Sequence, residues 1–343
     1  MNNWTKATLI ISLLFVTLLN AEVVKFTRKI SFGVQINTIY DNNIYLYSPD
    51  YIADFREQIR AYRFPINTYD DFITNINLSL RIPHAKSSNI YLYYKQYLYA
   101  MNAEKSYQIV SMTISQNIAN NLKSKIGYLF LPQYLIRYYR DPLGSATRYI
   151  GCTFAEHLFT FGIEYNLSNI KLNPFVRYEI DNYKKNFNFY DGEAFRFGLS
   201  LMVPIKFINL TAQVERKLNN AIGPVPDISY NQNAYQLTLT SPFYQKKLSF
   251  NISGSFQTRI YTTENAFEID PYHKDRNDKI FSFGTGLNYR LSKKIQMSLE
   301  YEKEKRSVKT PYNINIEEIK DYQAERISLG IRLNPNFVIQ QGE

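Results

Sequence analysis

Large apolar residues occupy nearly every second position over long stretches of this chain, and the residues between them are polar or charged. Between Ser282 and Lys305, one parity carries Phe283, Leu287 and Leu299, whereas the other carries glycine, asparagine, arginine and three glutamates. Successive side chains of a β-strand point to opposite faces. This spacing therefore predicts strands with one apolar and one polar face.

The same period of two recurs along the chain, and helical periodicity is scarce. The predicted strands cover residues 29–37, 72–82, 89–99, 108–118, 123–131, 157–167, 170–180, 194–203, 208–218, 234–243, 247–261, 279–291, 294–305 and 325–333. Their lengths match the ~9–11 residues of a tilted membrane strand. Strands of soluble sheets are more often about 5–6 residues long.

Short and long connections alternate between these predicted strands. The joins at 168–169 and 292–293 are tight, whereas 40–71, 137–151 and 262–278 are long. Outer-membrane barrels show this asymmetry, with short periplasmic turns and longer external loops. An even number of strands returns both chain ends to the periplasmic side.

Two architectures fit strands of this kind. In a soluble sandwich or solenoid the apolar faces pack together, whereas in a bilayer they contact lipid and the polar faces line a water-filled lumen. A sheet in lipid must also close, because unpaired backbone groups find no partner there. The richly ionised polar parity and the alternating loops favour the second architecture. We predict an all-β fold, a transmembrane antiparallel up-and-down β-barrel of about 14 strands (roughly 12–16), preceded by a signal peptide.

The polar parity supplies the side chains that we expect to line the pore. The predicted pore-lining residues are Lys29, Arg81, Lys95, Lys125, Lys171, Arg177, Arg196, Arg259, Arg290, Glu300, Glu302 and Arg332. Gly198 and several other glycines share this parity, where a missing side chain relieves crowding on the concave face.

The N-terminus has the order of a secretory signal. Lys6 precedes the mostly apolar, charge-free run Ala7 to Asn20, and Ala21 offers a small residue for cleavage. A membrane anchor is the alternative, but about 13 apolar residues fall short of the ~20 of a spanning helix. The sequence predicts a signal peptide over 1–21, a barrel over 22–334 and a C-terminal tail over 335–343, exported to the bacterial cell outer membrane.

Composition adds three constraints. The formal net charge of +10 would suggest nucleic acid as a partner, but export argues against it. The single cysteine, Cys152, excludes an intrachain disulfide framework. The 30 tyrosines and 23 phenylalanines suit strands and membrane interfaces. Tyrosines near strand ends, such as Tyr97 and Tyr139, indicate either interfacial girdles or simple strand preference, and the aromatic-rich segment Tyr40 to Asp71 is expected to narrow the lumen or to fold over the rim.

No catalytic, cofactor-binding or metal-binding motif is evident. The three histidines are His84, His157 and His273, and no zinc-protease, nucleophile-elbow, phosphate-loop or paired-cysteine pattern surrounds them. The run EIDPYHKDRND, residues 268–278, could hold Ca²⁺ or a proton-relay pair. A charged, solvated loop explains it more simply, so we predict that the protein is not an enzyme and has no cofactor.

Several segments resemble a largely uncharacterised family of porin-like bacterial outer-membrane β-barrels. The resemblance is carried by YDNNIYLYS (40–48), RFPINTYDDFI (63–73), SYQIVSMTISQNI (106–118), GYLFLPQYLIRYYRD (127–141) and FGTGLNYRLSKKIQMSLEYEKEKR (283–306). The later hairpins are similar to the barrel of surface-lipoprotein assembly modifiers. Such barrels often end on an aromatic residue that the barrel-insertion machinery reads, and Phe337 is the candidate here.

Function is inferred from the lumen. Its excess of basic residues indicates a passive pore for small hydrophilic solutes with a weak preference for anions. The charges alternatively pair across strands and only stabilise the barrel; Glu300 and Glu302 beside Arg290 and Arg332 are possible pairs. A non-conducting structural barrel and an assembly or translocation partner for surface proteins are the other hypotheses. Expected partners are outer-membrane lipid, small hydrophilic solutes and the insertion machinery, and no nucleic acid.

Overall fold

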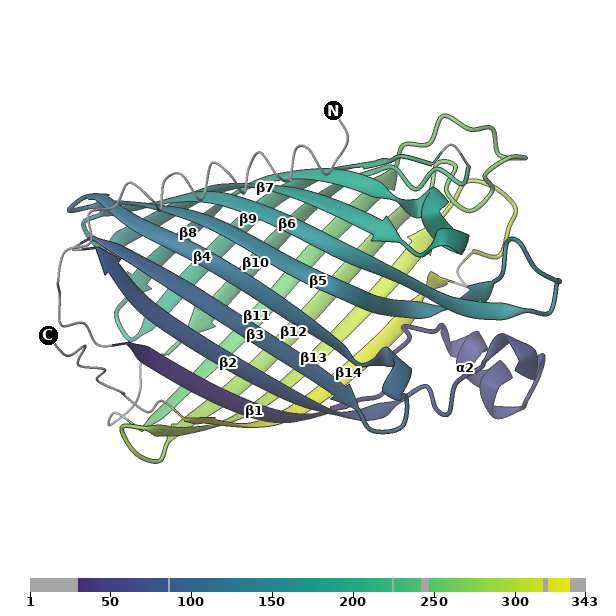
Figure 1. The fold of residues 1–343 in the computed structure, drawn as a ribbon. Coiled ribbons are helices and arrows are strands. Elements are labelled where there is room, and N and C mark those ends of the chain that lie inside the picture. The colour runs from purple at the N-terminus through teal and green to yellow at the C-terminus, as the bar shows by residue number, and fades with distance from the viewer. Residues whose placement is uncertain (1–29, 86, 224, 242–246, 317–319, 334–343) are drawn as a thin grey trace, which may run out of the picture.

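The strands close into a single antiparallel barrel in which each strand pairs with its sequence neighbours (Figure 1). The computed structural model describes residues 30–85, 87–223, 225–241, 247–316 and 320–333. The first and last strands complete the ring, with Val34 opposite Leu333 and Asp41 opposite Arg326. The all-β, up-and-down barrel of 14 strands is thereby confirmed.

The strands are long, as a tilted membrane-spanning sheet requires. They are β1 (Ser31–Asp41), β2 (Asp71–Ala85), β3 (Ser88–Tyr99), β4 (Tyr107–Ala119), β5 (Leu122–Arg140), β6 (Tyr149–Leu167), β7 (Ile170–Tyr183), β8 (Gly192–Ile205), β9 (Ile208–Ala221), β10 (Tyr230–Thr240), β11 (Leu248–Tyr261), β12 (Asn277–Arg290), β13 (Ile295–Lys309) and β14 (Tyr322–Leu333). The short helices are α2 (Pro49–Arg56), η1 (Ala61–Arg63), η2 (Ala103–Lys105) and η3 (Lys185–Tyr190). In the described residues, no helix combines the length and apolar composition needed to cross a membrane.

The connections alternate in length as the sequence indicated, although several long ones are shorter than predicted. Turns such as 168–169 lie at the end of the barrel where β1 begins, and long segments such as 42–70 lie at the other end. We call these the short-turn end and the long-loop end. The loop predicted over 137–151 is shorter than expected, because β5 and β6 extend into it from both sides and leave a loop of residues 141–148.

The extension of β5 was hidden by irregular pairing. The register between β5 and β6 shifts between Leu131 and Tyr134 and again between Leu135 and Arg137. Pro132 lies in the first shift, and proline in a sheet is confined to edges and bulges because it has no N–H to donate. The shifts interrupt the period of two on which the sequence analysis relied.

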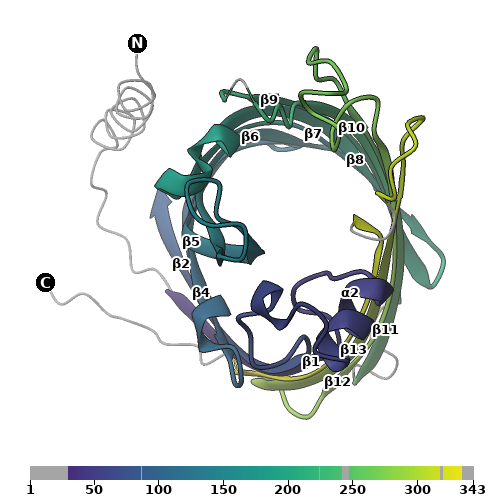
Figure 2. The ribbon, with the colours of Figure 1, turned by 90° about the vertical axis from the view of Figure 1, so that its right-hand side faces the viewer.

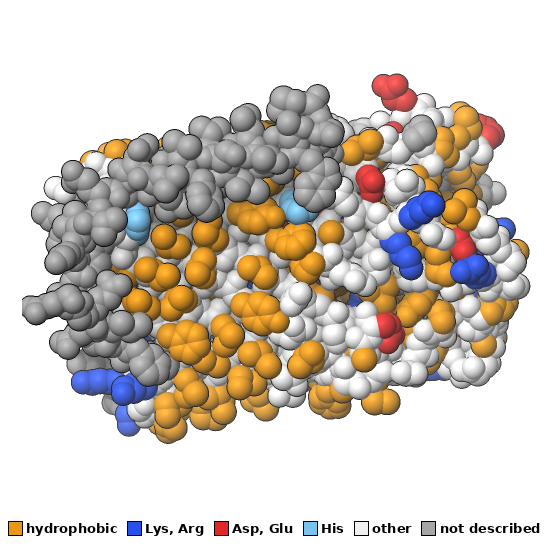
Figure 3. Space-filling model, in the orientation of Figure 1, with side chains coloured by type: hydrophobic (Ala, Val, Ile, Leu, Met, Phe, Trp, Pro, Cys, Tyr) orange, Lys and Arg blue, Asp and Glu red, His pale blue; other side chains and the backbone are white. Residues whose placement is uncertain are grey.

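The outer surface is apolar over the part that would contact lipid tails. Phe195, Phe197 and Leu199 of β8 point outward and are each more than two-fifths exposed, although they are large hydrophobic residues. Figure 3 shows hydrophobic side chains over the middle of the barrel wall and charged side chains toward its ends. A water-exposed surface of this kind would be unusual in a soluble protein. The apolar faces of the strands therefore point outward, as expected for a membrane barrel and not for a soluble sandwich.

The concave face is crowded at glycine positions. A Cβ atom on Gly198 would lie 2.5 Å from Cζ of Phe175 and 2.6 Å from the carbonyl oxygen of Val214. Phe175 lies directly opposite Gly198 on the neighbouring strand, so its ring covers the space that a side chain would need. This contact agrees with the role that the sequence indicated for glycines of the polar parity.

The segment after β1 folds inward over the long-loop end (Figure 2). Its residues Tyr45, Tyr47 and Phe64 are buried in a cluster with Ile73 of β2 and Leu135 of β5. Tyr97 and Tyr99 of β3 pack against the same cluster. These two tyrosines therefore face the interior and do not form a lipid-interface girdle.

We predict that arginine is tolerated on one face of β10 and not on the other. Leu237 is outward and 49% exposed, so Leu237→Arg should reduce the free energy of unfolding in lipid vesicles, by about 2–4 kcal/mol if the residue lies near the bilayer midplane. The adjacent Gln236 points inward, and Gln236→Arg should cost far less. Urea titrations of both variants test this, and equal costs would contradict the assignment of the two faces.

Candidate functional site

The predicted pore-lining residues are distributed over the inner wall of the barrel. Lys29 lies outside the described residues, and the other eleven share the parity opposite to the exposed hydrophobic residues. Arg177 and Arg196, for example, alternate with the outward residues Val176 and Phe197. The structure brings three of them, Arg177, Arg196 and Arg259, into one row and leaves most of the others apart.

This row crosses five neighbouring strands through directly paired residues. Arg177 of β7 lies opposite Arg196 of β8, which lies opposite Lys217 of β9. Gln232 of β10 and Arg259 of β11 continue the row. We call these five residues the basic row. Directly opposite residues of antiparallel strands share a face, and like charges there repel, so the row requires counter-charges.

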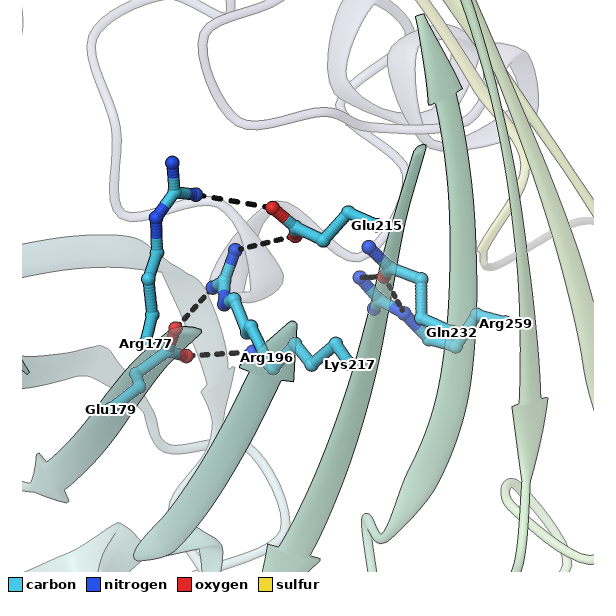
Figure 4. A network of polar contacts seen from close by, with 7 residues as sticks. All are labelled: Arg177, Glu179, Arg196, Glu215, Lys217, Gln232 and Arg259. Carbon is cyan, nitrogen blue, oxygen red and sulfur yellow. Dashed lines mark hydrogen bonds and ion pairs between the residues drawn. The ribbon is translucent and has the colours of Figure 1, made fainter. Parts of the chain in front are cut away.

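Glu179 and Glu215 supply those counter-charges (Figure 4). Glu215 accepts hydrogen bonds from Arg177 at 3.1 Å and from Arg196 at 3.5 Å. Glu179 accepts from Arg196 and, at 2.6 Å, from the Nζ of Lys217. Each carboxylate thus lies between two cations, which offsets the desolvation of charges on this partly buried wall.

Arg259 forms no ion pair with a carboxylate in the part of the chain that the structure describes. Its Nε and Nη2 donate to Oε1 of Gln232 at 3.2 and 3.1 Å, and its guanidinium carbon lies 4.3 Å from the ring centroid of Tyr230. Asp278 lies opposite Arg259 on β12, but among the described residues it forms ion pairs with Arg276 and Arg306. The end of the basic row at Arg259 therefore keeps a net positive charge.

Acidic residues gather on a different part of the wall. Glu300 and Glu302 of β13 line a hollow of about 480 Å³ whose rim also includes Arg196 and Glu215. Glu302 accepts from Arg326 of β14 at 3.4 Å, and Arg326 also pairs with Asp41 at 2.7 Å. The expected pairs with Arg290 and Arg332 do not appear among the described ion pairs; Arg332 donates to Gln35 at 3.1 Å. Positive and negative side chains of the inner wall thus meet around this hollow.

The remaining members of the predicted set occupy more exposed parts of the inner wall. Lys125 forms an ion pair of 2.7 Å with Glu164. Arg81 donates to Asn89 at 3.0 Å. Lys95 lines a hollow of about 490 Å³ together with Arg332, and Lys171 is exposed at the start of β7.

The predicted pore-lining set does not include Glu179, Glu215 or Lys217. Their importance depends on the pairing of strands that are distant from one another in sequence, so no local pattern distinguishes them. Glu156, Glu179 and Asp181 place carboxylate oxygens within 4.8 Å of one another. Because Glu179 is already bound by Arg196 and Lys217, these carboxylates are better explained by the basic row than by a metal ion.

The charged run 268–278 is not a solvated loop, and that expectation was wrong. Asp270, His273 and Arg276 are all buried. Nδ1 of His273 lies 2.7 Å from Oδ1 of Asp270, whose other oxygen accepts from the backbone N–H of Asp227. Burial lowers the pKa of His273, although Asp270 partly opposes this. Hydrogen bonds and ion pairs within the loop offset the free-energy cost of burying these polar groups. They also hold the loop in place at the barrel mouth.

Closure of all 14 strands, the apolar outer surface and the ionised inner wall together define a transmembrane β-barrel of the outer-membrane type.

Comparison with known proteins finds solved structures of similar shape and low sequence identity. No model of a protein family matches the chain, and no curated protein matches it. Solved structures with a similar shape include an anion-selective porin from Comamonas acidovorans, with 9% identity, 89% of this chain and 98% of that chain covered, and a TM-score of 0.46. The outer-membrane channel DcaP of Acinetobacter baumannii has 9% identity, coverage of 89% and 96%, and a TM-score of 0.49. OmpT, an outer-membrane protein of Vibrio cholerae, has 9% identity, coverage of 92% and 100%, and a TM-score of 0.48.

We predict that the shared carboxylate of Glu215 stabilises the barrel. Glu215→Gln leaves Arg177 and Arg196 facing each other without it and should lower the free energy of unfolding by roughly 1–3 kcal/mol. Glu164→Gln is the matched control: its partner Lys125 is 42% exposed, so the loss should stay below about 1 kcal/mol. Urea titrations in lipid vesicles compare the two, and a larger loss for Glu164→Gln would refute the ranking.

Proposed function

We propose that this protein is a passive pore of the outer membrane for small hydrophilic solutes, with a weak preference for anions. The observation that carries the proposal is the cationic wall that ends at Arg259. Three cations of the basic row share two glutamates, and Arg259 has a neutral amide and an aromatic ring as its neighbours. A lumen with a positive potential attracts anions and repels cations.

The preference should be weak because the inner wall also carries acidic residues. Glu300 is exposed and lines the same hollow as Arg196 and Gln232 of the basic row. Many of the basic side chains, such as Lys125, are neutralised by a neighbouring glutamate. Pairing across strands thus serves stability in part of the wall, and the residual charge is left to bias the passage of ions.

The small size of the proposed solutes follows from the narrowed mouth. Nζ of Lys105 donates to the carbonyl oxygens of Leu135 and Ile136 at 2.7 and 2.9 Å. The hydroxyl of Tyr45 donates to Glu104 at 3.0 Å. The bonds of Lys105 hold η2 against β5, and the bond of Tyr45 holds the segment that carries α2 against η2. This arrangement supports a constriction rather than a free external loop.

We further propose that residues 1–21 are removed on export, that residues 22–334 form the inserted barrel and that 335–343 remain as a tail. Residues 1–29 and Phe337 lie outside the described residues. In this proposal the barrel-insertion machinery recognises the C-terminal part of the chain, and the barrel has no enzymatic activity or cofactor.

Planar-bilayer recording tests the pore. In a KCl gradient the reversal potential should indicate a modest preference for chloride, and Arg259→Gln should reduce this preference because it removes an unneutralised lumen charge. Arg216→Gln is the matched control, since Arg216 is exposed on the outward parity of β9 and its loss should leave selectivity unchanged. Absence of conductance, or a clear cation preference, would reject the proposal.

The mouth segment offers a separate prediction. Replacing residues 49–63 by a short Gly-Ser linker removes α2, η1 and Phe55, which packs against Phe64 with ring centroids 5.7 Å apart. Single-channel conductance should rise, because the constriction loses part of its packed core. An unchanged conductance in a correctly folded barrel would show that the narrowest point lies elsewhere.

A further inference from the structure

Side chains from distant parts of the wall meet around a small cavity near the long-loop end. The cavity has a volume of about 210 Å³ and is lined by residues of β5, β6, β7, β9, β10, β11 and β13 and of four long loops. Nζ of Lys320, in the loop before β14, lies 5.4 Å from the ring centroid of Tyr139 on β5. Four strands separate β14 from β5 around the ring, so this contact reaches across the interior.

The lining of this cavity is strongly basic. We call its five cationic side chains the basic cluster; they are Arg137, Arg259, Arg276, Arg306 and Lys320. Among the described residues, Asp181 is the carboxylate that lines the cavity with them, and Asp278 pairs with Arg276 and Arg306. Asp270, which is close by, is engaged by His273. The positive charges of the cluster thus outnumber the negative charges.

Three members of the basic cluster have no ion pair among the described residues. Arg137 is only 8% exposed, and its Nε donates to the hydroxyl of Tyr139 at 2.9 Å. Arg259 has Gln232 and the face of Tyr230, and Lys320 has the face of Tyr139. A buried cation without a counter-charge costs several kcal/mol of desolvation free energy. An anion bound from solution would offset part of this cost.

The donors around the cavity point to the same conclusion. Nε of Arg306 is buried and has no partner among the described groups. Tyr183, Tyr190, Tyr230 and Tyr261 also line the cavity and carry hydroxyl groups. Burial, together with the positive charges of Arg137, Arg276 and Arg306, holds the pKa of Lys320 well below its usual range. An anion in the cavity would reverse that effect.

We propose that the basic cluster binds a small tetrahedral oxyanion of two or more negative charges, a phosphate group either free or as a monoester. Guanidinium groups present paired N–H donors that match phosphate oxygens. The donors here come from several sides of the cavity, which suits four tetrahedral oxygens better than one planar carboxylate. The volume is below the roughly 300–1,000 Å³ of sites for drug-sized ligands, so a small ion is favoured.

This binding site goes beyond the proposed pore and does not require that the barrel conducts. A site of this kind would concentrate phosphate at the long-loop end of the lumen. Solute entering from that end would meet it before the basic row, with which it shares Arg259.

Calorimetric titration of the purified full-length barrel in detergent with inorganic phosphate tests the proposal. We expect one phosphate per barrel with a dissociation constant below about 1 mM in a chloride buffer, and competition by sulfate. Succinate, a dianion with planar carboxylates, should bind more weakly. A glycerol 3-phosphate titration distinguishes a site for free phosphate from one that also accepts a monoester.

Variants assign the binding to the cluster. Arg137→Gln and Lys320→Gln should each weaken phosphate binding roughly 10- to 100-fold, the change expected when one charge-assisted hydrogen bond is lost. Lys185→Gln is the matched control, because Lys185 is exposed in η3 outside the cavity. This substitution removes the same charge from the same end of the barrel. Lys320 lies in a loop, so its variant keeps the test valid if Arg137→Gln fails to fold.

Three results would overturn the proposal: no phosphate binding by the folded barrel, equal weakening in Lys185→Gln and the cluster variants, or tighter binding of succinate than of phosphate. The first two indicate general attraction or none, and the third indicates a carboxylate site. A barrel that binds phosphate but does not conduct would leave this inference intact while rejecting the pore, and a conducting barrel without phosphate binding would do the opposite.

Discussion

Backbone hydrogen bonding is the constraint on which the whole structure depends. A strand in a bilayer has no water to satisfy its N–H and C=O groups, so every strand needs two neighbours. The pairing of β1 with β14 meets this requirement by joining the two ends of the sheet. Once the ring is closed, strand alternation assigns each residue to lipid or to the interior, and the charges of the polar parity must share an enclosed space.

That enclosure explains the organisation of the inner wall. Arg177, Arg196 and Lys217 would repel one another if they were alone, and Glu179 and Glu215 lie between them in space although they belong to other positions of β7 and β9. The arrangement separates stabilising charges from free ones. Arg259, at the end of the row, is shared by the wall and the cluster at the mouth, which links the proposed selectivity of the lumen to the proposed phosphate site.

The long-loop end is built by a different principle. There the chain buries polar and aromatic groups that would be exposed in ordinary loops, and it satisfies them with one another. Lys105 bonds to carbonyl oxygens of β5, and burial lowers its pKa to about 7. Asp270 holds both His273 and the backbone of Asp227. Internal pairing packs the loops of the mouth against one another. An anion would neutralise the cations that remain without a counter-charge.

The amino-acid sequence by itself determined the fold class, the approximate strand number and the face that contacts lipid, because each follows from a local period of two and from loop lengths. Gly198 and the polar parity of β12 and β13 could be interpreted in the same way. The tertiary structure alone decided which charges meet. Glu302 pairs with Arg326 rather than with Arg290 or Arg332 in the described residues, and Lys320 reaches Tyr139 across the interior. Register and loop folding bring together residues that are far apart in sequence, and no local pattern encodes that juxtaposition.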